Sequence, residues 1–292
     1  LYAAESVKVN ENTLQVSIAQ RDRGQELLNA GSIAKSDLAQ LEAQVSTDRY
    51  QLVTAQATLQ DYKLQLKQLL ELDGENEMNV YLPALSDENV LLPLPTKKDV
   101  YMSALTLRPE IEASKLSVEA SELGIDIAKA GYLPTISLSA GIGTNHTSGS
   151  DFTFGEQVKN GWNNSIGVSV SVPIFNNRQT KSAVQKAKLQ RETSLLSLLD
   201  EQKTLYKTIE GLWLDANSAQ QRYAAANEKL RSTQISYDLI SEQFNLGMKN
   251  TVELLTEKNN LLQAQQEQLQ AKYMAILNTQ LLKFYQGEKI TL

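Results

Sequence analysis

Two acidic side chains, Asp37 and Glu253, each lie six residues after a glycine that ends a helical stretch. The glycines are Gly31 and Gly247, and good helix formers follow both of them. Each carboxylate therefore falls near the third position of a new helix, where it can accept hydrogen bonds from backbone N–H groups and offset the positive helix end. Asn250, three residues before Glu253, completes a capping box. Taken alone, these residues predict helix capping.

No group of residues in the sequence predicts catalysis. His146 is the only histidine and has no companion at the spacing of metal ligands, so we expect a solvated loop residue. The pair Gly141-x-Gly143 lacks the third glycine and the following helix of a dinucleotide fingerprint. The remaining acidic residues lie beside Lys and Gln, as on a solvated helix face. We therefore expect no enzyme, no cofactor and no metal site within one chain.

The composition excludes several further functions and structural features. The chain has 292 residues, of which 21% are charged and 41% hydrophobic, with a net charge of -6. Interspersed charges and net acidity give nucleic acid phosphates no basic surface to bind. Cysteine is absent, so this chain has no disulfides or thiolate metal ligands. No run of 18 apolar residues predicts a membrane-spanning helix.

Two stretches alternate almost without exception between apolar and small polar residues, namely TISLSAGIG at 135–143 and NSIGVSVSV at 164–172. A period of two predicts strands with one dry face and one wet face, and we place them at 134–144 and 164–174. The polar, glycine-bearing loop 144–163 is too long for a tight hairpin turn. Such a short strand pair cannot bury its apolar face alone, so we expect it to contact lipid, other copies of the chain, or both.

The rest of the chain predicts long helices. Good helix formers predict helices over 1–29, 36–70, 98–130, 178–246 and 251–286. In the helix at 36–70, leucines near a seven-residue spacing favour packing on a neighbouring helix. Pro109 interrupts the helix at 98–130 as a first-turn residue. Between 71 and 98, repeated glycine and proline predict a linker, in which NVYL at 79–82 is a candidate short strand.

The two ends of the chain match each other at an offset of 216 residues, with a shared helix, Asn-x-Gly turn and helix. We interpret 1–71 as the helix pair of a truncated first repeat, 72–97 as the inter-repeat linker and 98–292 as the second repeat. The chain begins at Leu1, inside a helical pattern and without a leader. We therefore expect a fragment that lacks the front of the first repeat, about a hundred residues.

The order and spacing of several motifs resemble the TolC-like outer-membrane efflux channels, over essentially the whole chain. The motifs are LRPEI at 107–111, GYLPTISLSAG at 131–141, VSVSVPIFNNRQTKSAVQKA at 168–187, and the turns NAGSIAKSDL at 29–38 and NLGMKNTVEL at 245–254. The resemblance implies a mainly α fold with a small β part: long coiled-coil hairpins form a periplasmic tunnel, and two transmembrane strands join a barrel.

The resemblance also implies a function. It predicts a homotrimer of full-length subunits in the outer membrane of a Gram-negative bacterium, extending into the periplasm and working with a periplasmic adaptor and an inner-membrane pump. Each complete subunit gives four strands to a shared twelve-stranded barrel, so two strands per chain would not close it. The channel is then a passive exit duct for small molecules or exported polypeptides, gated at its periplasmic helical tip.

Four residues stand at positions that form the periplasmic aperture in the family: Asp37, Phe244, Lys249 and Glu253. The resemblance implies that Lys249 bonds the acid at Asp37 of a neighbouring subunit and keeps the pore shut. Three copies of Glu253 would form a negative ring that attracts cations. The sequence departs from some relatives at Phe244, where they have a latch tyrosine, and at Thr256, where they have a second acid.

Two further sets of residues match the family's contact surfaces. The resemblance implies that Gly31, Ser32, Gly247 and Met248 form the tips that a periplasmic adaptor contacts. Helix-ending glycines alone also account for both turns. Three aromatic residues flank the strands and suit a membrane-interface girdle. These are Tyr132, Trp162 and Phe175.

A second interpretation is a soluble coiled-coil scaffold or periplasmic adaptor, in which a helical hairpin only bridges other proteins. An adaptor would carry compact glycine-rich β domains on both flanks of its hairpin. This chain instead places its cleanest strands between two helix pairs, which favours the channel.

Overall fold

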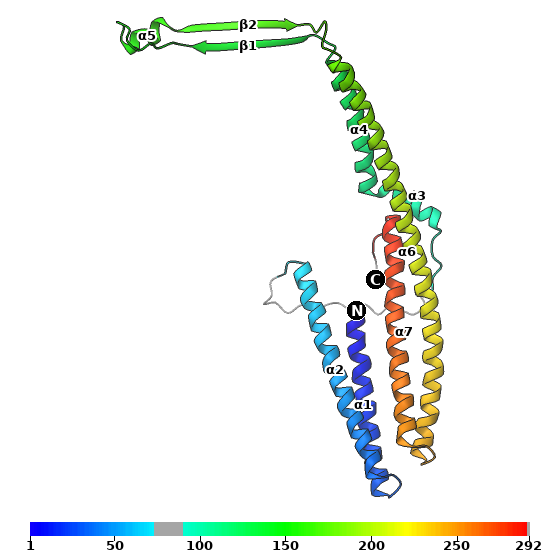
Figure 1. Cartoon of the computed structure of the whole chain (residues 1–292). Coiled ribbons are helices and arrows are strands. Elements are labelled where there is room, and N and C mark those ends of the chain that lie inside the picture. Colours follow the sequence, from blue (N-terminus) through cyan, green and yellow to red (C-terminus); the bar gives the residue numbers. More distant parts are fainter. Residues whose placement is uncertain (73–89, 291–292) are drawn as a thin grey trace. The chain divides into compact units, whose positions relative to one another are not determined.

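The computed structural model describes residues 1–72 and 90–290, and confirms a mainly helical chain with one small β-sheet (Figure 1). The candidate strand at 79–82 and most of the expected linker lie outside the described residues. In chain order the elements are α1 (Tyr2–Asn29), α2 (Lys35–Leu69), α3 (Lys97–Leu107), α4 (Pro109–Ala130), β1 (Thr135–Gly143), α5 (Phe154–Asn160), β2 (Asn163–Ser171), α6 (Gln179–Asn245) and α7 (Thr251–Gln286).

The chain divides into two compact units, and α6 contributes to both. The first unit contains residues 1–107 and 205–292, and the second contains residues 108–204. The second repeat expected at 98–292 does not coincide with either unit, so the division into repeats stays a prediction.

In the first unit, α1 and α2 form an antiparallel pair, and the second half of α6 pairs with α7 (Figure 1). Helix α7 also contacts α1 and α2. A buried apolar cluster near the turns joins all four helices through Leu27, Leu41, Phe244 and Leu254. Since these helices are amphipathic and long, such shared apolar side chains supply most of what holds one pair against the other.

In the second unit, β1 and β2 pair antiparallel, with Thr135 opposite Ser171 and Gly143 opposite Asn163. The register places Leu138 opposite Val168 and Ser137 opposite Ser169, so one face of the hairpin is apolar, except where Asn164 lies opposite Ile142, and the other is polar or glycine. Both strands are exposed along nearly their whole length. Strand β2 ends before Pro173, which lacks the N–H that would continue the ladder.

The loop between the strands contains a helix that the alternation pattern did not predict. Helix α5 begins with a capping box, in which the Thr153 N–H donates to Glu156 Oε2 at 2.9 Å and the Thr153 side chain accepts from the Glu156 N–H. Thr-x-x-Glu is a recognisable helix-start pattern, so the sequence did carry a signal for this short element.

Candidate functional site: the paired helix tips and the strand hairpin

The α1–α2 and α6–α7 turns have the same backbone geometry. At the first turn Ser32 N–H donates to Leu27 O at 2.8 Å and Gly31 N–H donates to Leu28 O at 2.9 Å. At the second turn the same two bonds join Met248 to Gln243 and Gly247 to Phe244, at 2.8 and 2.9 Å. This pair of backbone hydrogen bonds is the Schellman motif, and it satisfies carbonyl groups at the helix end. The two expected tips are therefore built alike.

Both turns depend on a glycine in the left-handed region, with φ of 74° at Gly31 and 75° at Gly247. A side chain at either position would meet no neighbour within 4 Å, so only backbone strain opposes a substitution. We expect Gly247→Ala to destabilise the turn by about 1–2 kcal/mol, measured as faster amide hydrogen exchange at the start of α7. Gly211→Ala, in open space within α6, should instead stabilise its helix by up to about 1 kcal/mol. Equal effects of the two substitutions would contradict this assignment.

The α7 N-terminus carries the capping box expected from the sequence. The Asn250 side chain accepts from Glu253 N–H at 2.9 Å, and Asn250 N–H donates to Glu253 Oε2 at 3.2 Å. Lys249 Nζ binds Glu253 Oε1 at 2.6 Å in the same chain. The hydrogen bond from Lys249, followed by that from the Asn250 backbone, lowers the pKa of the Glu253 carboxyl. Glu253 is therefore held ionised next to the turn.

The α2 N-terminus has only half of this arrangement. Ala34 N–H donates to Asp37 Oδ2 at 3.0 Å, but Ala34 has no side-chain acceptor to return the bond. Within one chain Lys249 is paired with Glu253 rather than with Asp37. The latch between Lys249 and Asp37 of a neighbouring subunit stays a prediction.

The remaining tip residues differ in exposure. Phe244 is buried in the apolar cluster with Leu27, Leu41 and Leu254, so its ring packs between the helix pairs of one chain. Gly31, Ser32, Gly247 and Met248 are all exposed. Met248, at 71%, and Leu246, at 75%, present bare apolar side chains at the second turn.

The strand hairpin presents a continuous apolar face to its surroundings. Ile136, Leu138, Ile166, Val168 and Val170 are between 60% and 82% exposed. A nine-residue strand is about 30 Å long, close to the thickness of the hydrocarbon core of a bilayer. Largely exposed apolar side chains in this number indicate a surface that lipid or another chain covers.

The predicted interface aromatics lie just beyond the strand ends. Tyr132 precedes β1 and Phe175 follows β2, so both belong to the end where Thr135 opposes Ser171. Trp162 immediately precedes β2, at the opposite end of the hairpin. All three rings are exposed. Aromatic residues thus flank the apolar face at both ends.

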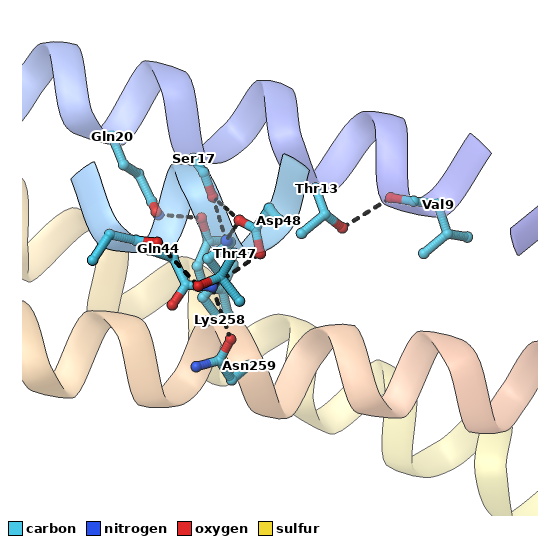
Figure 2. Close-up of polar contacts among 11 residues, drawn as sticks. Val9, Thr13, Ser17, Gln20, Gln44, Thr47, Asp48, Lys258 and Asn259 are labelled. Atoms are coloured by element: carbon cyan, nitrogen blue, oxygen red, sulfur yellow. Dashed lines mark hydrogen bonds and ion pairs between the residues drawn. The ribbon is translucent and has the colours of Figure 1, made fainter. Parts of the chain in front are cut away.

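Sequence reasoning missed a buried polar cluster made by Ser17 of α1, Asp48 of α2 and Lys258 of α7 (Figure 2). Lys258 Nζ donates to Asp48 Oδ2 and to Ser17 Oγ, and Ser17 Oγ donates to Asp48 Oδ2. The side chains of Lys258 and Asp48 are only 3% and 1% exposed. Burial lowers the pKa of the Lys258 ammonium, and the neighbouring Asp48 opposes that shift.

A sequence signal for this cluster exists. Lys258 lies four residues after Leu254 and three before Leu261, and Asp48 lies three residues after Val45. Both charged residues therefore interrupt the apolar stripes of their helices. What the sequence could not supply is the pairing, since the two are 210 residues apart.

Over residues 1–72 and 90–290, no group of three His, Cys, Asp or Glu side chains could hold a metal ion. None of the described helices is long and apolar enough to cross a membrane.

The fold and the paired tips define a class of long helical hairpins that carry a short exposed strand pair. The family model for outer membrane efflux proteins matches residues 100–288. The chain belongs to this family of outer membrane efflux proteins, as the sequence motifs predicted, and this membership favours the channel over the alternative interpretation as an adaptor or scaffold.

Relatives and solved structures agree with this assignment. The chain is 27% identical to the outer membrane efflux protein BepC of Brucella suis over 86% of its length, and 27% identical to the outer membrane protein TolC of Escherichia coli over 89%. It spans about half the length of these curated relatives, 52% and 53%. Among solved structures, it superposes on CusC with a TM-score of 0.78 at 19% identity, covering 99% of this chain and 65% of CusC. The MtrE outer membrane channel of Neisseria gonorrhoeae gives 0.72 at 17%, covering 98% and 62%.

Proposed function

We propose that the full-length protein is an outer-membrane channel, the passive exit duct of a tripartite efflux or secretion system. It transports small molecules or exported polypeptides, and it opens and closes at the periplasmic helix tips. Three subunits form the channel, a periplasmic adaptor and an inner-membrane pump engage it, and those partners supply the energy.

The observation that carries this proposal is the strand hairpin, with one face apolar apart from Asn164 and the other made of polar residues and glycine. An open two-stranded ribbon leaves unpaired N–H and C=O groups at its edges, which lipid cannot satisfy. Closure with strands from other subunits removes those edges, turns the apolar face to the acyl chains and encloses the serines and glycines around water. The flanking rings of Tyr132, Trp162 and Phe175 then lie at the two membrane interfaces.

The gate in this proposal is formed by Asp37, Lys249 and Glu253 from three subunits around one axis. Glu253 is ionised and close to the turn, so three copies form a negative ring that favours cations. Lys249, already bonded to Glu253, bridges to Asp37 of the next subunit and links neighbouring tips. Phe244 contributes by packing, because its buried ring holds the two helix pairs of one subunit together.

The adaptor in this proposal contacts the two turns through Gly31, Ser32, Gly247 and Met248. The matched Schellman geometry supports this role, because it presents two similar exposed turns to one partner. The exposed Met248 and Leu246 side chains give that partner an apolar contact.

Conductance measures the gate directly. We expect Lys249→Ser, introduced into the full-length protein, to raise single-channel conductance in planar bilayers severalfold, and Lys249→Asp to raise it further by repulsion. Lys229→Ser is the matched control, since Lys229 forms a similar exposed pair with Glu267 at 2.6 Å on α6 and α7, outside the proposed gate. Unchanged conductance in the Lys249 variants would contradict the gate assignment.

A further inference from the structure

The buried cluster of Ser17, Asp48 and Lys258 joins three helices at one point. Each residue comes from a different helix, α1, α2 and α7, and their polar atoms bond one another (Figure 2). Gln44 Nε2 adds a bond to Asp48 Oδ1 at 2.9 Å and reaches Asn259 Oδ1 at 3.4 Å. The cluster is therefore a mutual set of bonds that exists only in one alignment of the helices.

The apolar side chains around the cluster define the alignment of the helices less well than the polar bonds do. Leu41 and Val45 on α2, and Leu254 and Leu261 on α7, are similar aliphatic residues repeated along each helix. Aliphatic seams of this kind tolerate a shift of one helix along another, whereas a single buried polar contact fixes the register of paired helices. A shift here would leave Asp48 and Lys258 buried without partners, which is strongly unfavourable.

The cluster is not repeated at the equivalent positions of the two helix pairs. At the offset of 216 residues that relates the two helix pairs, Ser17, Asp48 and Lys258 correspond to Thr233, Ala264 and Glu42. Ala264 is buried and Glu42 is exposed, so the equivalent positions cannot form an ion pair of this kind. The polar contact thus distinguishes the α1/α2–α7 interface from the equivalent contact of α2 with the α6–α7 pair.

The position of the cluster relative to the turns also matters. Lys258 lies seven residues after Thr251, the first residue of α7, which is about 10 Å along the helix. Between the cluster and the turns, the two helix pairs are joined by the apolar cluster of Leu27, Leu41, Phe244 and Leu254.

We propose that Ser17, Asp48 and Lys258 form a register pin, which fixes α1 and α2 along α7 and so positions the two tips of one subunit. The proposal rests on the proposed function for the role of the tips. Opening of the gate then leaves the helices aligned at the pin, and movement is confined to the turns below it and to the interfaces between subunits.

Crosslinking tests the pin without any measurement of transport. These 292 residues contain no cysteine, so every thiol within them is an introduced one. Gln44→Cys with Asn259→Cys probes the observed register, and Gln44→Cys with Gln263→Cys probes a shift of one helical turn along α7. Both pairs lose the same Gln44 bond. In the full-length protein, a short bifunctional thiol reagent should join the first pair at least about tenfold faster than the second, which corresponds to about 1.4 kcal/mol.

The apolar variant Ser17→Ala/Asp48→Leu/Lys258→Met removes the pin while keeping the site filled. We expect the preference between the two pairs to fall below threefold, because the aliphatic seams alone remain. Lys229→Met, which removes an exposed pair between α6 and α7, should leave the preference unchanged. A tenfold preference that survives in the apolar variant would overturn the pin. If that variant fails to assemble as a trimer, the single substitution Ser17→Ala must still lower the preference, and no change would equally overturn the proposal.

A second measurement tests the effect on opening. Crosslinking the Gln44→Cys/Asn259→Cys pair in the Lys249→Ser channel should leave its raised conductance unchanged. A loss of conductance that reverses when a cleavable reagent is reduced would show movement at the pin and overturn the proposal. If the starting protein shows no channel activity, the proposed function fails, while the crosslinking preference still decides the pin.

Discussion

Replacing Leu138 with arginine is expected to keep the protein from assembling in the outer membrane. Leu138 lies near the middle of β1, opposite Val168 on the apolar face, and is 75% exposed. An arginine facing lipid at mid-bilayer costs about 2–4 kcal/mol, and a trimer carries it three times. We expect a large loss of heat-resistant trimer in the outer-membrane fraction, measured by fractionation and unheated gel electrophoresis.

The neighbouring residue supplies the control. Ser137 lies opposite Ser169 on the small, polar face of the same strand. Ser137→Arg introduces the same charged side chain one position away, but we expect the trimer to assemble because the side chain faces water. Similar losses in both variants would mean that the two faces of the hairpin do not meet different surroundings.

Replacing Lys258 with methionine is expected to destabilise the helical unit by about 3 kcal/mol, because breaking a buried ion pair leaves one charge without its partner. Asp48 keeps bonds from Ser17 and Gln44, but it loses the ammonium in a site where its side chain is 1% exposed. Amide hydrogen exchange in α1, α2 and α7 of the full-length protein should become about a hundredfold faster.

Two further variants show whether this effect is specific to the buried ion pair. Lys229→Met breaks an exposed ion pair and should change the free energy of opening, measured by hydrogen exchange, by less than about 1 kcal/mol. Adding Asp48→Leu to Lys258→Met removes the orphaned carboxylate and should restore most of the lost protection, since apolar replacements of a buried pair are often neutral. If the single Lys258→Met variant exchanges as slowly as the original protein, the buried pair does not contribute as described.

Local patterns were enough to predict the parts of the fold that local physics determines. Alternation located both strands, because successive side chains on a strand point to opposite faces. Gly31 and Gly247 marked the helix turns, because both need a backbone conformation that glycine adopts without strain. The spacing of Asn250 and Glu253 predicted the capping box that they form.

Other features depend on contacts that no local pattern encodes. Asp48 and Lys258 each break an apolar stripe, but which charge meets which is decided by how α2 and α7 pack. The same packing buries Phe244 between Leu27 and Leu254, which spacing alone could not place. The roles of Asp37, Lys249 and Glu253 at a pore axis depend on neighbouring subunits and stay proposals.

A channel wall requires that the two faces of the strand hairpin meet different media. Spin labels placed singly at Val168 and at Ser169 in the full-length trimer, reconstituted in lipid vesicles, measure this directly. We expect the label at 168 to be relaxed by oxygen dissolved in the acyl chains, and the label at 169 by a water-soluble nickel chelate. Equal access of the chelate to both positions would contradict the assignment of this chain to a membrane channel.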